Sequence, residues 1–581
     1  MASSAPYDLR AHLASLFSAA LQDVAPDNAA FPVALERPKA MEHGDFACNL
    51  ALQLAKPLKR NPREIAQALV SALPPSPVIE RAEIAGAGFI NLFLKPSAKR
   101  AVARQVLEQG DAYGRIGYGK GRKVQIEFVS ANPTGPLHVG HGRGAAYGAS
   151  LANVLDAAGF AVQREYYIND AGRQMDILAL STWLRYLELQ AVIVPFPPNG
   201  YQGDYVRDMA AGIAAAHGKR YVRAAEAVSV GAPPVEDDSE AHLDVLIANA
   251  KQALGEDYAY LHDYALTEQL GDCRNDLLEF GVTFDRWFSE RSLFDAGHVE
   301  RALERLQQAG HLYLQDGATW FRSTAFGDEK DRVVQRENGQ YTYFASDIAY
   351  HLNKLERGFD LAIDVWGADH HGYIARVKGA LQALGLDPER LTVALVQFAV
   401  LYRDGKKASM STRAGEFVTL RELRGEVGND AARFFYVLRK SDQHLDFDLD
   451  LAKSQSTDNP VYYVQYAHAR ICSVLEKWAG HEPDLAQADL TALDSEQELR
   501  LLRQLMEFPQ VIEDAAHELS PHLVAFYLKE LAGAFQSYYQ AVPFLVDEAR
   551  VREARLALVA ATGRVLRNGL RLLGVSAPQR M

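Results

Sequence analysis

One stretch, residues 124–141, constrains the fold of this chain more than any other. Its first half places Val124, Ile126 and Phe128 at every second position, which predicts a buried strand. A turn rich in polar residues, Gly and Pro follows, and Pro136 suits the first position of a helix. The stretch therefore predicts a strand, a turn and a helix N-terminus. Open α/β sheets bind ligands at such strand ends, and helix N-termini attract phosphate.

Two histidines stand in the predicted first turn of that helix. His138 and His141 are three positions apart and so share a face, and Gly140 between them leaves room for a flat group near the backbone. Two imidazoles can donate hydrogen bonds to phosphate oxygens while charge moves during phosphoryl chemistry. A pair of histidines that only caps an ordinary helix explains the same four residues equally well.

The composition bounds the class of protein. A chain of 581 residues suggests three or four domains, and it has no run of about eighteen apolar residues, so we expect no membrane-spanning helix. The N-terminus lacks the pattern of a signal peptide, and we expect a cytoplasmic protein. The cysteines Cys48, Cys273 and Cys472 lack metal-binding spacing, so no structural zinc is expected. A net charge of −13 argues against indiscriminate nucleic-acid binding but leaves room for one specific RNA partner.

The chain divides into three segments by pattern. Residues 1–116 predict a small α/β domain, and residues 454–581 are helical throughout. Residues 117–453 contain the strand ends described here, with a loosely patterned insertion at about 181–263. The predicted fold class is α/β, with a Rossmann-like parallel-sheet domain between a small α/β domain and an all-helical domain.

Acidic and aromatic residues form one group of site candidates. Glu290 ends the segment 284–290, and Tyr343 and Asp347 are four positions apart, so they share a face if a helix begins there. A hydrogen-bonded aromatic–carboxylate cap is the structural alternative for that pair.

A second group follows the apolar run 361–366, which predicts a central parallel strand. Gly367, Asp369 and His370 stand at its carboxyl end, where they suit a ribose or an α-amino group. The neighbouring His371 makes a His-His pair, but no third zinc ligand is near in sequence.

A third group lies in a basic loop after residues 393–403, which we predict to be one strand. The loop contains Lys406, Lys407, Met410, Ser411 and Arg413. For Lys406 and Lys407 a charged surface hairpin is a real alternative. We expect the segments that end at Asn132, Asp369 and Arg403 to meet at one rim of a shared parallel sheet.

These motifs resemble those of one family. His-Val-Gly-His resembles the His-Ile-Gly-His signature of class I aminoacyl-tRNA synthetases, and residues 130–141, Ser-Ala-Asn-Pro-Thr-Gly-Pro-Leu-His-Val-Gly-His, resemble the arginyl-tRNA synthetase version. The basic loop resembles the second class I signature, Lys-Met-Ser-Lys-Ser, with Ser409 and Thr412 in place of both lysines. Residues 1–116 resemble the appendage that contacts the tRNA elbow, and residues 454–581 resemble the helical anticodon-binding domain.

The resemblance implies a reaction in two steps. The carboxylate of arginine attacks the α-phosphate of ATP and releases pyrophosphate, and the adenylate then passes arginine to the terminal ribose of its tRNA. The implied partners are L-arginine, ATP with Mg²⁺ and the tRNA for arginine, and the family's usual state is a monomer.

The resemblance and the chemistry of these ligands together suggest a role for each candidate. The ATP phosphates and adenosine would be bound by His138, Gly140, His141, Gly367, Asp369, Met410 and Ser411. The cation at the leaving pyrophosphate would be Lys406, Lys407 or Arg413, helped by magnesium. A guanidinium needs carboxylate acceptors, which Glu290 and Asp347 would supply beside Tyr343. The α-amino end would be held by Glu127, Ser130, Asn132 and His370.

Two other functions remain open at this point. A small-molecule nucleotidyltransferase uses the same pair of histidines to bind phosphate but does not need the two flanking domains. A non-catalytic RNA-binding relative is the other, because the second signature is degraded.

Overall fold

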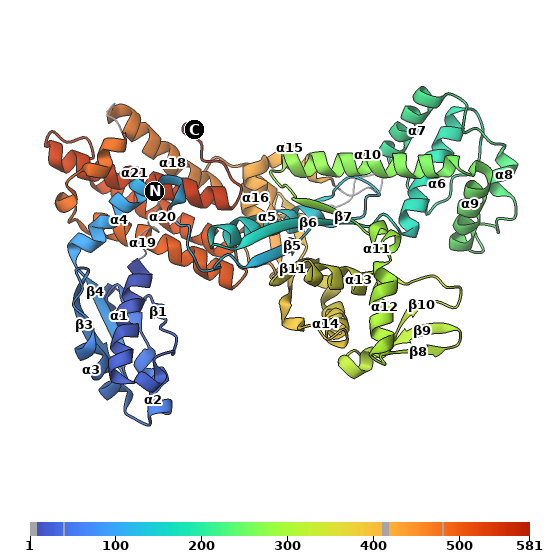
Figure 1. The fold of residues 1–581 in the computed structure, drawn as a ribbon. Helices are drawn as coiled ribbons and strands as arrows, with labels where there is room; N and C mark the ends of the chain where they lie inside the picture. The colour runs from blue at the N-terminus through green and yellow to red at the C-terminus, as the bar shows by residue number, and fades with distance from the viewer. Residues whose placement is uncertain (1–8, 39–40, 409–417, 479–481) are drawn as a thin grey trace, which may run out of the picture.

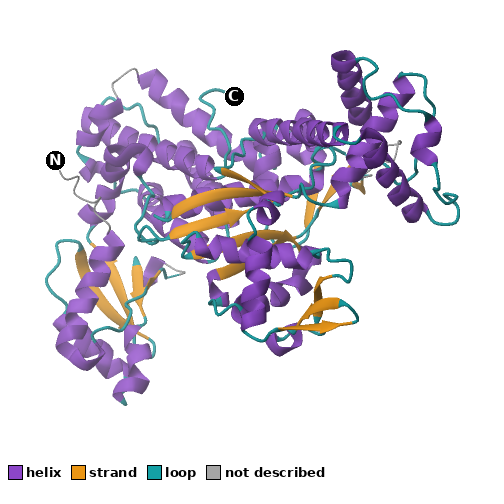
Figure 2. Ribbon diagram, turned by 45° about the vertical axis from the view of Figure 1, so that its right-hand side comes forward, coloured by secondary structure: helices purple, strands orange, loops and turns teal. Residues whose placement is uncertain are grey.

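The computed structural model describes residues 9–38, 41–408, 418–478 and 482–581. A small N-terminal unit lies below a bundle of C-terminal helices, and a central α/β domain joins that bundle to a helical insertion at the far side (Figure 1). Helices cover the central strands on both faces (Figure 2).

The N-terminal unit is an antiparallel sheet covered by three helices. Its strands pair in the order β1 (Leu35–Glu36), β2 (Phe46–Cys48), β4 (Phe89–Leu94), β3 (Ile79–Ala85). The helices are α1 (Leu9–Val24), α2 (Leu50–Leu58) and α3 (Pro62–Ala72). The predicted small α/β domain is present.

The central sheet is parallel throughout. Its order is β12 (Leu391–Val396), β11 (Leu361–Gly367), β5 (Lys123–Glu127), β6 (Ala161–Ile168), β7 (Arg286–Ser289). The chain adds β6 and β7 on one side of β5 and then β11 and β12 on its other side. This is therefore a doubly wound sheet, whose ligand site is expected at the carboxyl ends of β5 and β11.

Two helices cover opposite faces of this sheet. Phe128 packs toward α5 (Val139–Ala157), because a Cβ added at Gly148 would lie 2.3 Å from the Phe128 ring. Glu127, the next residue back, contacts α13 (Tyr343–Glu356) on the other face. Alternate side chains of a strand point to opposite faces, so both faces of β5 are buried by a helix.

Insertions extend the sheet domain on one side. Between β6 and β7 lie α6 (Arg173–Leu189), α7 (Asp204–His217), α8 (Ala225–Ser229), α9 (Ser239–Leu254) and α10 (Asp257–Glu279). Between β7 and α13 lie α11 (Arg291–Asp295), α12 (His298–Gln308), and the strands β8 (Leu312–Gln315), β9 (Ala318–Phe321) and β10 (Arg332–Gln335). The helix α14 (Ile374–Ala383) connects β11 to β12.

Two predictions about boundaries are wrong. The helix begins at Val139, not at Pro136, because the His138 side chain accepts a backbone hydrogen bond as the N-cap. Residues 393–403 are not one strand. They contain most of β12 and then β13 (Ala399–Arg403), which belongs to another sheet with β14 (Lys406–Lys407) and β15 (Leu445–Asp448). The segment that ends at Arg403 therefore does not share the parallel sheet of β5 and β11.

The remaining helices connect this sheet to the C-terminal bundle. They are α15 (Leu420–Val427), α16 (Asn429–Val437) and α17 (Leu449–Lys453), followed by α18 (Pro460–Trp478), α19 (Glu496–His517), α20 (His522–Ala541) and α21 (Ala549–Leu572). In the part of the chain that the structure describes, none of the helices has the length and apolar character to cross a membrane.

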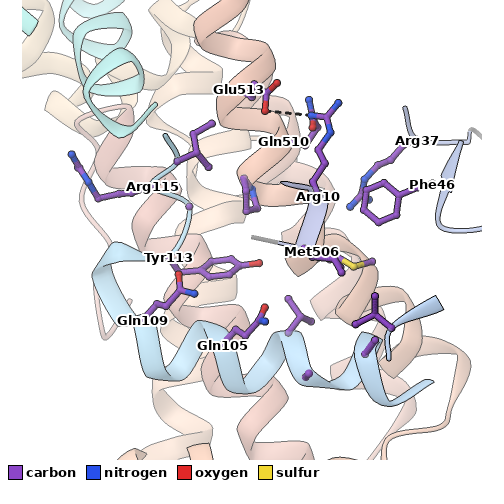
Figure 3. Close-up of a pocket in the computed structure, with 18 of the residues that line it drawn as sticks. Arg10, Arg37, Phe46, Gln105, Gln109, Tyr113, Arg115, Met506, Gln510 and Glu513 are labelled. Atoms are coloured by element: carbon purple, nitrogen blue, oxygen red, sulfur yellow. Dashed lines mark ion pairs between the residues drawn. The ribbon is translucent and has the colours of Figure 1, made fainter. Parts of the chain in front are cut away.

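The N-terminal unit and the bundle meet along α4 (Pro96–Gln109), which packs against α19 and α21. A cavity of about 320 Å³ lies at this junction, with Arg10, Arg37, Tyr113 and Met506 among its lining residues (Figure 3). Arg10 forms an ion pair with Glu513 of α19 at 3.4 Å. This cavity lies between two domains and shares no residue with the strand ends described next.

Candidate active site

The N-terminus of α5 is built around two stacked imidazoles. The ring centroids of His138 and His141 are 3.7 Å apart. The Nδ1 of His138 accepts the Gly140 N–H at 3.1 Å, and the Nδ1 of His141 accepts the His138 N–H at 3.3 Å. Each Nε2 therefore carries the hydrogen and can donate it. The histidines do cap the helix, and the same hydrogen bonds fix them as donors.

Burial keeps both rings neutral. Desolvation lowers the pKa of His138, and desolvation with the neighbouring ring lowers the pKa of His141 to about 3. Gly140 is required by this packing, because a Cβ there would lie 2.8 Å from the His138 ring. Near neutral pH the site therefore offers uncharged N–H donors rather than imidazolium ions.

The far end of the basic loop lies directly against this helix N-terminus. The Val139 N–H donates to the Val418 carbonyl at 3.0 Å, and the Leu420 N–H donates to the Leu137 carbonyl at 2.7 Å. At the near end, the exposed Lys406 and Lys407 pair with β13 as a short hairpin. The predicted residues Met410, Ser411 and Arg413 lie outside the described residues. The described residues 418–420 thus lie beside the N-terminus of α5.

The carboxyl end of β11 contributes to the same edge of the sheet. Gly367 ends the strand, and the side chains of Asp369 and His370 that follow are 62 % and 61 % exposed, 3.6 Å apart. A Cβ at Gly367 would lie 2.5 Å from the Asp369 carboxylate. Among the described residues, no cluster of three potential metal ligands exists here or elsewhere.

Two neighbouring carboxylates, the buried Glu290 after β7 and the half-buried Asp347 in α13, form the next part of the site. Glu290 is 4 % exposed, and its Oε1 accepts a hydrogen bond from the Ser346 hydroxyl at 2.8 Å. Its Oε2 and the Tyr167 hydroxyl are both buried and interact with each other, but among the described residues neither atom makes a hydrogen bond of normal geometry. The Asp347 carboxylate accepts a hydrogen bond from Tyr373.

The electrostatics of this pair favour a cation. Desolvation raises the pKa of Glu290 and of Asp347. Desolvation also raises the pKa of Tyr167, and the charges of Glu290, Asp347 and Glu127 raise it further. Neither Glu290 nor Asp347 has an ion-pair partner within the described ranges. A bound guanidinium would relieve the burial cost of both carboxylates.

Tyr343 lies near this pair, because desolvation and then the charge of Glu290 raise the pKa of its hydroxyl. It is the first residue of α13 and is 57 % exposed. Its hydroxyl would lie 2.8 Å from a Cβ added at Gly172. The predicted helical face shared by Tyr343 and Asp347 is therefore present.

The turn after β5 brings the remaining candidates to this edge. The Ser130 hydroxyl donates to Glu127 Oε1 at 2.9 Å, and it accepts the Tyr167 N–H at 3.1 Å. The Asn132 side-chain oxygen accepts a hydrogen bond from Asn169 at 3.1 Å. The other oxygen of Glu127, Oε2, is 2.5 Å from the Lys354 ammonium, so both Glu127 oxygens already have partners within the protein.

Sequence reasoning did not single out Tyr167, His351, Lys354 or Asp364. One signal was available, since His351 and Lys354 follow Asp347 at the spacing of one helical face. The other was Asp364, a charged residue in the middle of an apolar strand.

Residues 102–192 and 246–448 match the family described as "tRNA synthetases class I (R), catalytic domain". The parallel sheet and its histidine-capped helix are therefore those of a class I tRNA synthetase. Residues 11–94 match the "Arginyl tRNA synthetase N terminal domain", and residues 464–581 match the "DALR anticodon binding domain". An arginine–tRNA ligase of Nitrosospira multiformis is 67 % identical over 574 residues, which cover 99 % of each chain. The chain belongs to the arginyl-tRNA synthetase family.

Solved structures agree with this assignment. A crystal structure described as a putative arginyl-tRNA synthetase of Campylobacter jejuni is 33 % identical, with a TM-score of 0.74, and covers 83 % of this chain and 99 % of its own. The Thermus thermophilus arginyl-tRNA synthetase structure is 24 % identical, with a TM-score of 0.75 over 99 % of this chain, and it supports the fold of the whole chain.

Proposed function

We propose that the edge of the sheet formed by β5, β7, β11 and the N-terminus of α5 activates arginine with ATP. The chain is an arginine–tRNA ligase, so the activated arginine passes to its tRNA. One observation carries the assignment of the amino-acid site: Glu290 and Asp347 are neighbouring carboxylates without an ion-pair partner among the described residues, and the Oε2 of Glu290 makes no hydrogen bond of normal geometry there. A guanidinium has five N–H donors, and lysine cannot reproduce their fork.

Each end of arginine has its own group of residues. Glu290 and Asp347 bind the guanidinium, with Tyr343 alongside. Ser130 and Asn132 hold the α-amino end, with Glu127 behind Ser130 and His370 on the neighbouring strand end. This arrangement points the substrate carboxylate toward the N-terminus of α5.

ATP lies along that helix N-terminus. His138 and His141 donate to its phosphates, while Gly140, Gly367 and Asp369 bind the adenosine, together with Met410 and Ser411 of the basic loop. No side-chain nucleophile is needed, because the arginine carboxylate forms the bond to the α-phosphorus and the bond to pyrophosphate breaks. The work of the protein is positioning and stabilisation of charge.

The leaving pyrophosphate needs cations. Lys406, Lys407 and Arg413 of the basic loop are the proposed candidates, because both lysines of the second signature are absent. Mg²⁺ enters with ATP, since this ion is commonly held by substrate phosphates and one or two carboxylates.

The flanking domains bind the tRNA. We assign residues 1–116 to the tRNA elbow, residues 117–453 with the insertion at about 181–263 to catalysis, and residues 454–581 to the anticodon. The proposed setting is a cytoplasmic monomer.

The test is arginine- and tRNA-dependent exchange of pyrophosphate into ATP. Exchange that needs arginine, together with charging of tRNA, supports the proposal. Arginine-independent exchange without any tRNA effect would favour a small-molecule nucleotidyltransferase. RNA binding without exchange would favour a non-catalytic relative.

A further inference from the structure

Three carboxylates form a row across the middle of the central sheet. Asp364, Glu127 and Glu165 are register neighbours on β11, β5 and β6. These carboxylates contact side chains of α13 and of Arg357, which directly follows it. The residues of α13 that make these contacts are Tyr350, His351 and Lys354. Central strands of a parallel sheet are normally apolar on both faces, so a charged row here needs an explanation.

Lys354 lies against two members of this row, Glu127 and Asp364. It is 0 % exposed, and its Nζ donates to Glu127 Oε2 at 2.5 Å and to Asp364 Oδ1 at 2.6 Å. Burial lowers the pKa of this ammonium, but the two carboxylates raise it above its ordinary value. Lys354 is therefore a charged bridge between two neighbouring strands and the helix above them.

One branch from Lys354 leads to the α-amino end of the site. Glu127, which Lys354 holds by one oxygen, accepts the Ser130 hydroxyl with the other. The backbone here is unusual, because Val129 and Ser130 have φ values of 69° and 40°. A β-branched residue rarely adopts this left-handed conformation, so neighbouring contacts must hold the turn in place. The Glu127–Ser130 hydrogen bond is one of these contacts.

The other branch leads to the guanidinium end. Asp364 Oδ2 lies 2.7 Å from His351 Nε2, and His351 Nδ1 lies 2.8 Å from the Asp347 carbonyl oxygen. The ring therefore lies between the Asp364 carboxylate and the backbone of the Asp347 turn. This branch fixes the turn of α13 from which the Asp347 carboxylate projects.

We propose that Lys354 is a positioning residue that sets the distance between the two ends of the arginine site. Through Glu127 it holds the Ser130 turn, and through Asp364 and His351 it holds the Asp347 turn of α13. The inference rests on the proposed function of Ser130 and Asp347. It adds that a residue without access to the substrate determines the length of amino acid that the site accepts.

The test compares Lys354→Met with Arg357→Met. Arg357 joins the same helix to the same row of carboxylates, since its NH1 lies 2.5 Å from Glu165 Oε2, but it contacts neither Glu127 nor Asp364. Both variants lose a buried ion pair, so both should melt at a lower temperature than the parent. Kinetics are measured by pyrophosphate exchange in the full-length chain with tRNA present.

A positioning role predicts a split between substrates. We expect Lys354→Met to raise the KM for arginine by about tenfold to 100-fold, while the KM for ATP changes by less than about twofold. The preference for arginine over homoarginine, which is one methylene longer, should fall by about tenfold. Arg357→Met should leave both quantities near the parent values.

A compensated variant keeps the test decisive if the single variant does not fold. Lys354→Met combined with Asp364→Asn removes one of the two carboxylates that the single variant leaves without a cation. This variant should recover stability and still show the raised arginine KM. Parent-like arginine KM and homoarginine preference in any folded Lys354 variant would overturn the inference, and so would equal effects in Arg357→Met.

The proposed function has a separate test. If Asp347→Asn affects arginine and ATP equally, the assignment of the guanidinium site fails whatever Lys354→Met does. If Asp347→Asn affects arginine alone and Lys354→Met does not, only the positioning role fails.

Discussion

At the N-terminus of α5, burial turns His138 and His141 into neutral hydrogen-bond donors. Across the end of β5, burial raises the pKa of Glu290 and Asp347, and neither carboxylate has an ion-pair partner among the described residues. The same desolvation thus prepares one half of the site for polyanionic ATP and the other half for cationic arginine. The difference teaches that each half is matched to its ligand by what surrounds its side chains, and it predicts that the two halves can be damaged separately.

The largest effect is expected for a change at Asp347, which should weaken the binding of arginine but not that of ATP. Asp347→Asn keeps the shape of the side chain and removes its charge, so the KM for arginine should rise by about 100-fold or more, the usual cost of breaking a buried charged hydrogen bond. The KM for ATP should stay within about threefold. Steady-state pyrophosphate exchange with each substrate varied in turn measures both. Equal increases would mean that Asp347 supports the whole site rather than the guanidinium.

A change at His141 should have the opposite effect, slowing the reaction of ATP without weakening the binding of arginine. His141→Ala removes an N–H donor to the phosphates, so kcat for exchange should fall by about 30- to 100-fold while the KM for arginine stays near its parent value. His141→Gln keeps an amide donor and should recover part of the rate. Single-turnover adenylate formation measures the step directly, and an unchanged rate in His141→Ala would remove this ring from the mechanism.

The pH dependence should come from the carboxylate half alone. The raised pKa values of Glu290 and Asp347 mean that these groups take up protons at a higher pH than ordinary carboxyls, whose pKa is about 4. A protonated carboxyl loses its charge, so the KM for arginine should rise as the pH falls, by up to about tenfold per unit below the pKa.

The histidine half should show no such dependence. The pKa of His141 is lowered to about 3, so this ring stays neutral from pH 8 down to pH 5. The KM for ATP should therefore be flat over that range. A loss of exchange that follows a pKa near 6.5, the ordinary value for histidine, would contradict the account.

The smallest effect is expected at the exposed hairpin. Lys406→Gln and Lys407→Gln remove charges that solvent screens, so each should slow exchange by about two- to fivefold, and less at high salt. The salt dependence of kcat measures this. A loss of more than about 100-fold, unaffected by salt, would instead place that lysine directly on the pyrophosphate.

Local patterns predicted the framework of the site. The alternation at 124–128 predicted β5, the apolar run 361–366 predicted β11, and the spacing of Tyr343 and Asp347 anticipated the start of α13. The sequence pattern predicts too early a start for α5, because a histidine cap does not follow the usual N-cap preferences. The division of residues 393–403 between two sheets depends on partners in β11 and β15, which no local pattern contains.

The buried charges were beyond such reasoning. Lys354 and Glu127 are separated by 227 positions, and their contact exists only after two strands and a helix have assembled. That Glu290 Oε2 makes no hydrogen bond of normal geometry among the described residues is likewise a property of the folded chain. Sequence could propose which residue types bind arginine, and the structure adds which of them have spare hydrogen-bonding capacity.

The central claim is that arginine's guanidinium binds between Glu290 and Asp347. A structure of the full-length chain with arginine bound tests it most directly. The account predicts guanidinium nitrogens within about 2.7–3.2 Å of Glu290 Oε2 and of the Asp347 carboxylate. A guanidinium bound elsewhere, with Glu290 Oε2 hydrogen-bonded only to the Tyr167 hydroxyl, would contradict it.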